Sequence, residues 1–434
     1  MKKQINNEII RLSVPNILSN ISVPLLSTVD TILMGSLSSV HLAAVGLGSF
    51  LFNVIYWNFG FLRMGTTGMT AQGFGAKDND EVWLSLMRAG VLSLLVAVLL
   101  LIFQNPIYEL AKSALMVSSD NDPLVLAYFN VRIWAAPAGL MLMVIMGWLF
   151  GMQNAIYPLL LTVVINIVNI CLSYYLVKIA EMDVVGVALG TVIAQYVGLL
   201  FGIVLILLKY KPYINWSLIK ELNTLSAYRR FLKVNFDLFL RTLCLTFSFG
   251  FFYRQSSKLG DTVLAVNVVL MQFVNWMSYG IDGFAYATES LVGKYKGANK
   301  LTALKTVIHQ SFLWGGLVSL IYAATYYIFG IQLFGIFSDD AALLHVGEDL
   351  LFFMSIFPIL AFASYIWDGI FVGLTATTSM RNAMILALIV YIVSFYLIPH
   401  SANGSNIWIA LSIFMVARAL FQWIYYNKYG LEMV

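Results

Sequence analysis

The sequence predicts an all-α membrane protein with about twelve transmembrane helices in two lobes of six. Three observations support this fold class. Hydrophobic residues make up 60% of the 434 residues and charged residues only 11%, a balance typical of polytopic membrane proteins. Apolar runs of roughly twenty residues recur along the whole chain. The second half of the chain also repeats sequence features of the first half at a nearly constant offset.

The apolar runs define the expected spans in order. A helix of about twenty residues crosses the hydrocarbon core of a bilayer, so each run of that length predicts one span. In the N-terminal half the spans are expected at 9–34, 43–72, 84–104, 127–151, 158–180 and 184–208. In the C-terminal half they are expected at 231–255, 262–292, 304–330, 349–375, 380–399 and 405–427.

Basic residues in the connections orient these spans. Most of them fall on one side of the predicted membrane: Lys2, Lys3, Lys77, Arg88, Lys209, Lys211, Lys220, Arg229, Arg230, Lys294, Lys296, Lys300, Lys305, Arg381 and Lys428. Because basic loops stay in the cytoplasm, both termini are expected there, in the inner membrane of a prokaryote. The N-terminus has no cleavable signal peptide pattern, so the first span is expected to stay in the protein.

The connection at 209–230 is the longest polar segment on the basic side and predicts a linker between an N-terminal lobe (1–208) and a C-terminal lobe (231–434). Matching features support a duplication: Pro137 with Pro358, Gly147 with Gly369, and Gly151 with Gly373, about 221–222 positions apart. With six spans per half, both copies run in the same direction. Such a parallel repeat predicts a pseudo-twofold axis along the membrane normal and a cavity between the lobes.

The first span contains the most informative polar residue, Asp30. A carboxylate inside the membrane is costly and usually marks an ion or substrate pathway. Asn16 and Asn20 share its helical face, and Pro15 near the start of the span removes a backbone donor and favours a bend. The alternative is a structural carboxylate paired with Arg63 of the second span, whose charge would lower the pKa of such an acid.

Further polar residues of the N-terminal half lie in the fifth and sixth spans. Asn166, Asn169 and Ser173 recur at helical spacing, and Thr191 lies in the sixth span. Together with Asp30 they offer carboxylate, amide and hydroxyl oxygens, which suit a proton or a small cation such as sodium. Hydrogen bonds between helices are the alternative explanation for the amides and hydroxyls.

The C-terminal half has its own polar stripe. Asp282, Tyr286 and Glu289 follow one face of the eighth span, and Asp368 lies in the tenth. These residues predict either a second polar site or structural ion pairs. Asp237 and Arg241, four residues apart in the seventh span, are expected to pair with each other. Arg132 and Arg418 are explained equally well by snorkelling, pairing or function.

Several classes of function are excluded. The sequence has no phosphate-binding glycine loop, no His-Glu-x-x-His and no Cys-x-x-Cys, so an enzyme or a metal site beyond a sodium ion is not expected. The net charge of +4 gives no indication of nucleic-acid binding. Cys171 and Cys244 lie in apolar runs and predict no disulfide.

Four motifs in order resemble the multidrug and toxic compound extrusion (MATE) family, in its DinF-like branch. They are T-V-D at 28–30 followed by M-G at 34–35, F-G-F-L-R-M-G-T-T-G at 59–68, D-G-F-A at 282–285 with E-S-L-V-G at 289–293, and W-D-G-I-F-V-G-L-T-A-T at 367–377. The resemblance covers essentially the whole chain. It implies two six-helix lobes in a V-shaped arrangement and export of organic cations or amphipathic molecules by antiport with protons or sodium, without a cofactor.

The resemblance also implies roles for individual residues. Asp30 is implied as the coupling acid, and Pro15 as the bend of the first span. Asn169 and Thr191 match the family's cation site in the N-terminal lobe, but Ser173 stands where an aspartate is expected. This departure favours protons over sodium. A functional monomer in contact with membrane lipid is expected. The competing function is a flippase for lipid-linked oligosaccharides, which needs a basic cavity for a pyrophosphate.

Overall fold

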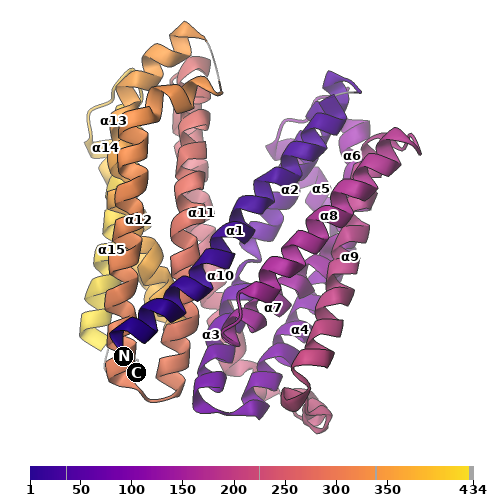
Figure 1. Ribbon diagram of the computed structural model, residues 1–434. Coiled ribbons are helices and arrows are strands. Elements are labelled where there is room, and N and C mark those ends of the chain that lie inside the picture. Colours follow the sequence, from indigo (N-terminus) through magenta and orange to yellow (C-terminus); the bar gives the residue numbers. More distant parts are fainter. Residues whose placement is uncertain (36, 224, 338–339, 430–434) are drawn as a thin grey trace. The chain divides into compact units, whose positions relative to one another are not determined.

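The computed structural model describes residues 1–35, 37–223, 225–337 and 340–429, without the side chains of 23–27, 223, 225–227, 342 and 429. Within these ranges the chain forms fifteen α-helices and three short 3₁₀ segments, and no strand (Figure 1). The predicted all-α class is therefore confirmed. Eleven segments, counted over the described residues, are long and apolar enough to cross a membrane.

Contacts between residues divide the chain into two compact units. The N-terminal unit is Leu18–Leu232, and the C-terminal unit is Met1–Ile17 together with Lys233–Val434. The first helix, α1 (Lys2–Gly35), is therefore shared between the units, and the division falls two residues after Pro15. The lobe boundaries expected from the linker at 209–230 stay a prediction. The segment at 211–223 itself forms two 3₁₀ turns, η2 (Lys211–Tyr213) and η3 (Trp216–Asn223).

The N-terminal unit holds helices α2 to α9 and the second half of α1. Their bounds are α2 Ser39–Asn58, α3 Phe61–Ala76, α4 Asn79–Ile102, α5 Gln104–Ala114, α6 Asp122–Arg132, η1 Ile133–Ala135, α7 Ala136–Gly151, α8 Ile156–Lys178 and α9 Asp183–Lys209. The expected span at 43–72 is thus two helices, since α2 ends at Asn58 and Gly60 precedes α3.

The C-terminal unit holds helices α11 to α15, most of α10 and the first half of α1. Their bounds are α10 Leu225–Ser257, α11 Asp261–Gly297, α12 Leu301–Gly335, α13 Ala341–Gly373, α14 Thr377–Leu397 and α15 Ser405–Tyr429. Helix α11 packs against α12 and α13, and α13 also packs against α15 (Figure 1). These contacts place the polar residues of α11, α13 and α15 near one another.

The matched glycines lie at equivalent helix contacts in the two units. A Cβ atom at Gly147 would lie 2.4 Å from the backbone oxygen of Arg63, and one at Gly369 would lie 2.3 Å from that of Ala285. Only glycine permits so close an approach of two helix backbones. The spacing from Arg63 to Ala285 equals the spacing from Gly147 to Gly369. The α3–α7 and α11–α13 contacts are therefore two copies of one arrangement, as the predicted duplication requires.

Candidate functional site

Asp30 is buried in the N-terminal unit, with 8% of its surface exposed. None of the described side chains donates a hydrogen bond to its Oδ1 atom. The charged group that acts on it is the guanidinium of Arg132, at the end of α6. A buried carboxylate without a hydrogen bond is costly, so an opposite charge or a bound proton is needed to stabilise it.

Arg132 lies in an aromatic environment. Its guanidinium carbon is 5.2 Å from the ring centre of Phe52 and 5.6 Å from that of Tyr56, both on α2. Its charge also acts on the hydroxyls of Tyr56 and Tyr128. Cation–π contacts of this kind stabilise an arginine out of water. The two rings therefore help to hold the guanidinium of Arg132 inside the unit.

Arg132 is a candidate functional residue that the sequence left undecided. An arginine within an apolar span indicates a functional or paired residue. The sequence could not show which residues of α2 surround Arg132, because that depends on tertiary packing. Arg63, the partner considered for Asp30, lies with its guanidinium carbon 6.0 Å from the ring centre of Phe150. The pairing of Arg63 with Asp30 stays a prediction.

Helices α8 and α9 bring together three of the expected ion ligands. Nδ2 of Asn169 donates a hydrogen bond of 2.8 Å to Oγ1 of Thr191. A Cβ at Gly190 would lie 2.7 Å from Oγ of Ser173, so the glycine allows α9 to approach α8 at this point. Oδ1 of Asn169 and Oγ of Ser173 are buried and have no hydrogen-bond partner in the described part of the chain. Two buried oxygens with free acceptor capacity fit a small hard cation.

Asn166 has a different contact. Its Nδ2 atom donates a hydrogen bond of 3.1 Å to the backbone oxygen of Ser22 on α1. One turn away, the hydroxyls of Thr162 and Ser19 lie 2.9 Å apart. These bonds fasten α8 to the second half of α1. A direct role of Asn166 in ion binding stays a prediction.

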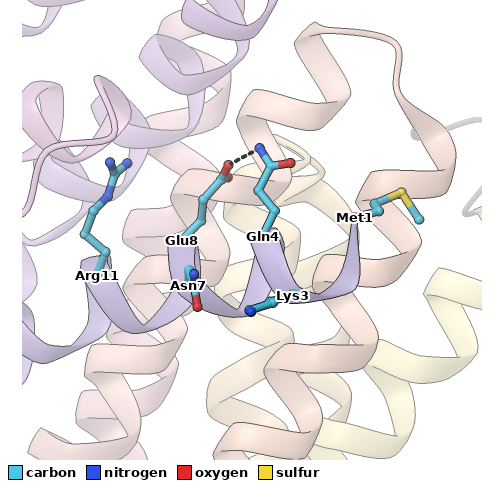
Figure 2. Close-up of a pocket in the computed structure, with 6 residues that line it drawn as sticks. All are labelled: Met1, Lys3, Gln4, Asn7, Glu8 and Arg11. Carbon is cyan, nitrogen blue, oxygen red and sulfur yellow. Dashed lines mark hydrogen bonds between the residues drawn. The ribbon is translucent and has the colours of Figure 1, made fainter.

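The first half of α1 is fastened to the C-terminal unit. Glu8 accepts hydrogen bonds from Nζ of Lys294 at 2.8 Å and from the hydroxyl of Tyr295 at 3.0 Å. Figure 2 shows Glu8 also bonded to Gln4, in a pocket along the first turns of α1. Near Pro15, a Cβ at Gly283 would lie 2.3 Å from the side chain of Ile17. The two halves of α1 are thus held by different sets of helices, and Pro15 lies next to the division.

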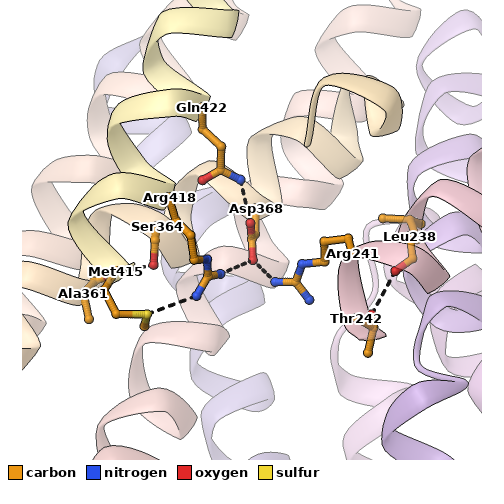
Figure 3. Close-up of polar contacts among 9 residues, drawn as sticks. All are labelled: Leu238, Arg241, Thr242, Ala361, Ser364, Asp368, Met415, Arg418 and Gln422. Atoms are coloured by element: carbon orange, nitrogen blue, oxygen red, sulfur yellow. Dashed lines mark hydrogen bonds and ion pairs between the residues drawn. The ribbon is translucent and has the colours of Figure 1, made fainter. Parts of the chain in front are cut away.

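Asp368 lies in a buried ion cluster of the C-terminal unit (Figure 3). Its Oδ2 accepts hydrogen bonds from Arg241 on α10 and, at 2.8 Å, from Arg418 on α15. Its Oδ1 accepts one of 2.7 Å from Gln422. Asp282 acts electrostatically on both arginines and Tyr286 on Arg241. The negative charges of two acids therefore offset the positive charges of two arginines within this unit.

The expected pair between Asp237 and Arg241 is wrong. Asp237 instead accepts a hydrogen bond of 2.5 Å from Arg381 and one of 2.6 Å from Thr378 in the first turns of α14. The N-terminus of a helix attracts an anion, which explains why Asp237 turns to α14 while Arg241 turns to Asp368. Glu289 lies buried further along α11. A Cβ atom added at Gly373 would lie 2.5 Å from the backbone oxygen of Glu289, so α13 approaches α11 closely at this point.

The MatE family model matches the chain twice, at residues 15–175 and 238–397, which confirms the duplication. The Escherichia coli protein named DNA damage-inducible protein F is 34% identical over 412 residues, covering 94% of this chain and 89% of the relative. A probable multidrug resistance protein NorM of Bacillus anthracis is 20% identical and covers 87% of this chain and 84% of its own length.

Solved structures match the fold. An outward-facing multidrug resistance MATE family transporter has a TM-score of 0.89 at 22% identity, covering 99% of this chain and 96% of that one. The MATE transporter VcmN of Vibrio cholerae in its bent form also has a TM-score of 0.89, at 17% identity and with 100% and 98% coverage. At these identities the likeness concerns the fold of the chain.

Proposed function

This chain belongs to the MatE family of multidrug and toxin efflux transporters, and from that premise we propose that it exports organic cations or amphipathic molecules in exchange for protons. The observation that carries the proposal is the buried Asp30, which has an unpartnered oxygen and Arg132 as its charged neighbour. We also propose that it acts as a monomer in a prokaryotic inner membrane, with both termini in the cytoplasm.

The charge of Asp30 is the proposed switch. When ionised, its carboxylate is attracted to Arg132 of α6. When a proton binds, that attraction is lost, while Phe52 and Tyr56 still accommodate Arg132. The helix that carries Asp30 is then less strongly held toward α6. Proton binding can in this way change the position of α1, while the rings of Phe52 and Tyr56 limit the cost of leaving the charge of Arg132 without its partner.

Pro15 is the proposed bend between the two halves of α1. Thr162 and Asn166 of α8 hold the half with Asp30, whereas the half that ends at Ile17 is bound by Lys294 and packs on Gly283. Because proline removes one backbone hydrogen bond, the helix bends there at lower cost than elsewhere. A change at Asp30 would accordingly bend α1 near Pro15 and release the substrate.

Protons are favoured over sodium by two features of the N-terminal unit. Ser173 is neutral, so Asn169, Ser173 and Thr191 contribute oxygens without charge to the α8–α9 site. Arg132 adds a positive charge near Asp30, which opposes the binding of either cation, but a proton needs only one carboxylate oxygen whereas sodium needs several oxygen ligands. The buried oxygens of Asn169 and Ser173 still make sodium the alternative ion to test.

The test of ion coupling is efflux of a fluorescent organic cation from proteoliposomes under imposed gradients. A proton gradient alone is expected to drive transport, and a sodium gradient at equal pH is not. Vesicles without protein give the background. Transport driven by sodium alone would contradict proton coupling, and transport that responds to neither gradient would contradict the antiporter itself and favour the flippase.

The second test concerns the partner of Asp30. Asp30→Asn and Arg132→Met are each expected to lower the melting temperature, and the double variant is expected to lose less than the sum, with an interaction energy of about 0.5–3 kcal/mol. The reason is that each single variant leaves the other buried charge unbalanced. Arg63→Met is the matched control. Its effect is expected to add to that of Asp30→Asn, and the reverse pattern would identify Arg63 as the partner.

A further inference from the structure

Two adjoining pockets on the C-terminal unit form a groove beside α12. One pocket, of about 450 Å³, lies among α12, α13 and α15, and the other, of about 540 Å³, lies between α12 and the start of α1. Lys305 and His309 line both pockets. We call this continuous surface the α12 groove. It is separate from Asp30, Arg132 and the α8–α9 ligands, which belong to the N-terminal unit.

The charge of the α12 groove has one sign. Lys2, Lys305 and His309 line it, and no carboxylate is present among its described lining residues. Neither lysine forms an ion pair with any residue that the structure describes. Lys305, in the second turn of α12, is also among the basic residues that predict the cytoplasmic side. The groove therefore suits an anionic group at the cytoplasmic surface of the membrane.

One wall of the groove is aromatic. The ring of Trp367 is 5.2 Å from that of Phe312 and 5.1 Å from that of Tyr426, centre to centre. Trp423 on α15 also lines the groove and is 51% exposed. Tryptophan and tyrosine are enriched where lipid headgroups meet the hydrocarbon core. The aromatic wall therefore places the groove at the depth of the headgroups.

The groove continues into apolar surface along α12. Lys305 and His309 are followed on the same helical face by Leu313 and Leu317, which are 51% and 49% exposed. On α15, Leu420 lies one turn before Trp423 and is 48% exposed. A ligand that fills the groove can thus extend from the basic residues along leucines on two helices. A small soluble anion would bind the basic residues but would not cover this apolar surface.

From these features we propose that the α12 groove binds an anionic phospholipid of the cytoplasmic leaflet. Lys2, Lys305 and His309 bind the phosphate, the aromatic wall packs against the glycerol region, and the acyl chains follow α12 and α15. The bound lipid contacts α12, α13 and α15 at once. Its binding is expected to stabilise the C-terminal unit against unfolding.

The experiment compares lipid binding by the full-length protein and its variants in native mass spectrometry. Phosphatidylglycerol is the anionic probe, and phosphatidylcholine of equal chain length is the neutral control. Lys305→Glu with His309→Gln is expected to weaken phosphatidylglycerol binding at least about fivefold and to leave phosphatidylcholine unchanged. The matched control is Lys220→Glu, which reverses the charge of an exposed lysine in the N-terminal unit. It should leave phosphatidylglycerol binding unchanged.

Further arms separate lipid from free phosphate and guard against misfolding. Inorganic phosphate at millimolar concentration should not displace the lipid, and Trp423→Ala should weaken lipid binding without changing the net charge. If the charge-reversal variant fails to fold, Lys305→Gln replaces it in the experiment. This milder change removes the charge, keeps a similar side-chain length, and is expected to give a smaller loss of phosphatidylglycerol affinity. Equal binding of both lipids by the native protein, an unchanged affinity in Lys305→Gln, or displacement by inorganic phosphate would each overturn the proposal.

Discussion

Asp30→Asn is expected to reduce proton-driven efflux to the level of vesicles without protein, while the purified variant remains folded. Asparagine has nearly the same volume as aspartate but cannot exchange a proton, so the variant keeps the packing and loses the switch. The residual Arg132 is stabilised by the rings of Phe52 and Tyr56, which limits the loss of stability.

The measurement is initial efflux from proteoliposomes at a fixed pH gradient, with the amount of folded protein checked by size-exclusion chromatography. Asp120→Asn, a change of the same type at an exposed residue of a loop, should retain native activity. Binding of substrate to the detergent-solubilised Asp30 variant should persist, since the proposal assigns coupling to this acid. Native rates in the Asp30 variant would remove Asp30 from the mechanism.

Asp368→Asn is expected to produce the largest loss of stability. Asp368 accepts hydrogen bonds from Arg241 and Arg418, and both arginines are at least nine-tenths buried. Removing the shared carboxylate leaves two buried positive charges close together, and breaking a buried ion pair from one side costs about 3–5 kcal/mol. We expect a strong fall in melting temperature. The control is Asp349→Asn, at an exposed acid of the same helix, which should change the melting temperature little.

A combined variant separates structure from transport at this cluster. Asp282→Asn and Asp368→Asn together with Arg241→Met and Arg418→Met replace both acids and both arginines of the cluster by uncharged groups, which is often neutral for stability. The combined variant is expected to recover most of the melting temperature lost by Asp368→Asn alone. If it also transports, the cluster serves stability. If it is stable but inactive, the charges take part in transport, and failure to recover stability would contradict the ion-pair account.

The sequence predicted the helical architecture because membrane spans depend on composition over about twenty residues, which is a local property. It also predicted that Asn169 and Thr191 belong to one group of polar side chains, and the structure contains a hydrogen bond between them. The role of Asp30 stays a prediction. The sequence could not decide which arginine lies near Asp30. Arg63 and Arg132 are both arginines in apolar spans, and only the packing of α2 against α6 places Phe52 and Tyr56 around Arg132.

The incorrect pair of Asp237 and Arg241 has the same origin. Spacing along one helix determines which residues share a face, and it favours a local pair when both side chains are in water. Inside the C-terminal unit each side chain also meets another helix. The first turns of α14 offer Asp237 donors from Thr378 and Arg381, and α13 offers Arg241 a carboxylate. Tertiary partners of this kind carry no signal in a single sequence.

The glycine contacts shared by the two units indicate how duplicated halves diverge. The position of Arg63 in α3 corresponds to Ala285 in α11, and the position before Gly147, Met146, corresponds to Asp368 before Gly369. Backbone contacts were inherited by both copies, whereas charged side chains at equivalent positions are present in one copy and absent from the other. The two copies thus share these backbone contacts but carry different charged side chains, which separates the proposed coupling acid of the N-terminal unit from the ion cluster of the C-terminal unit.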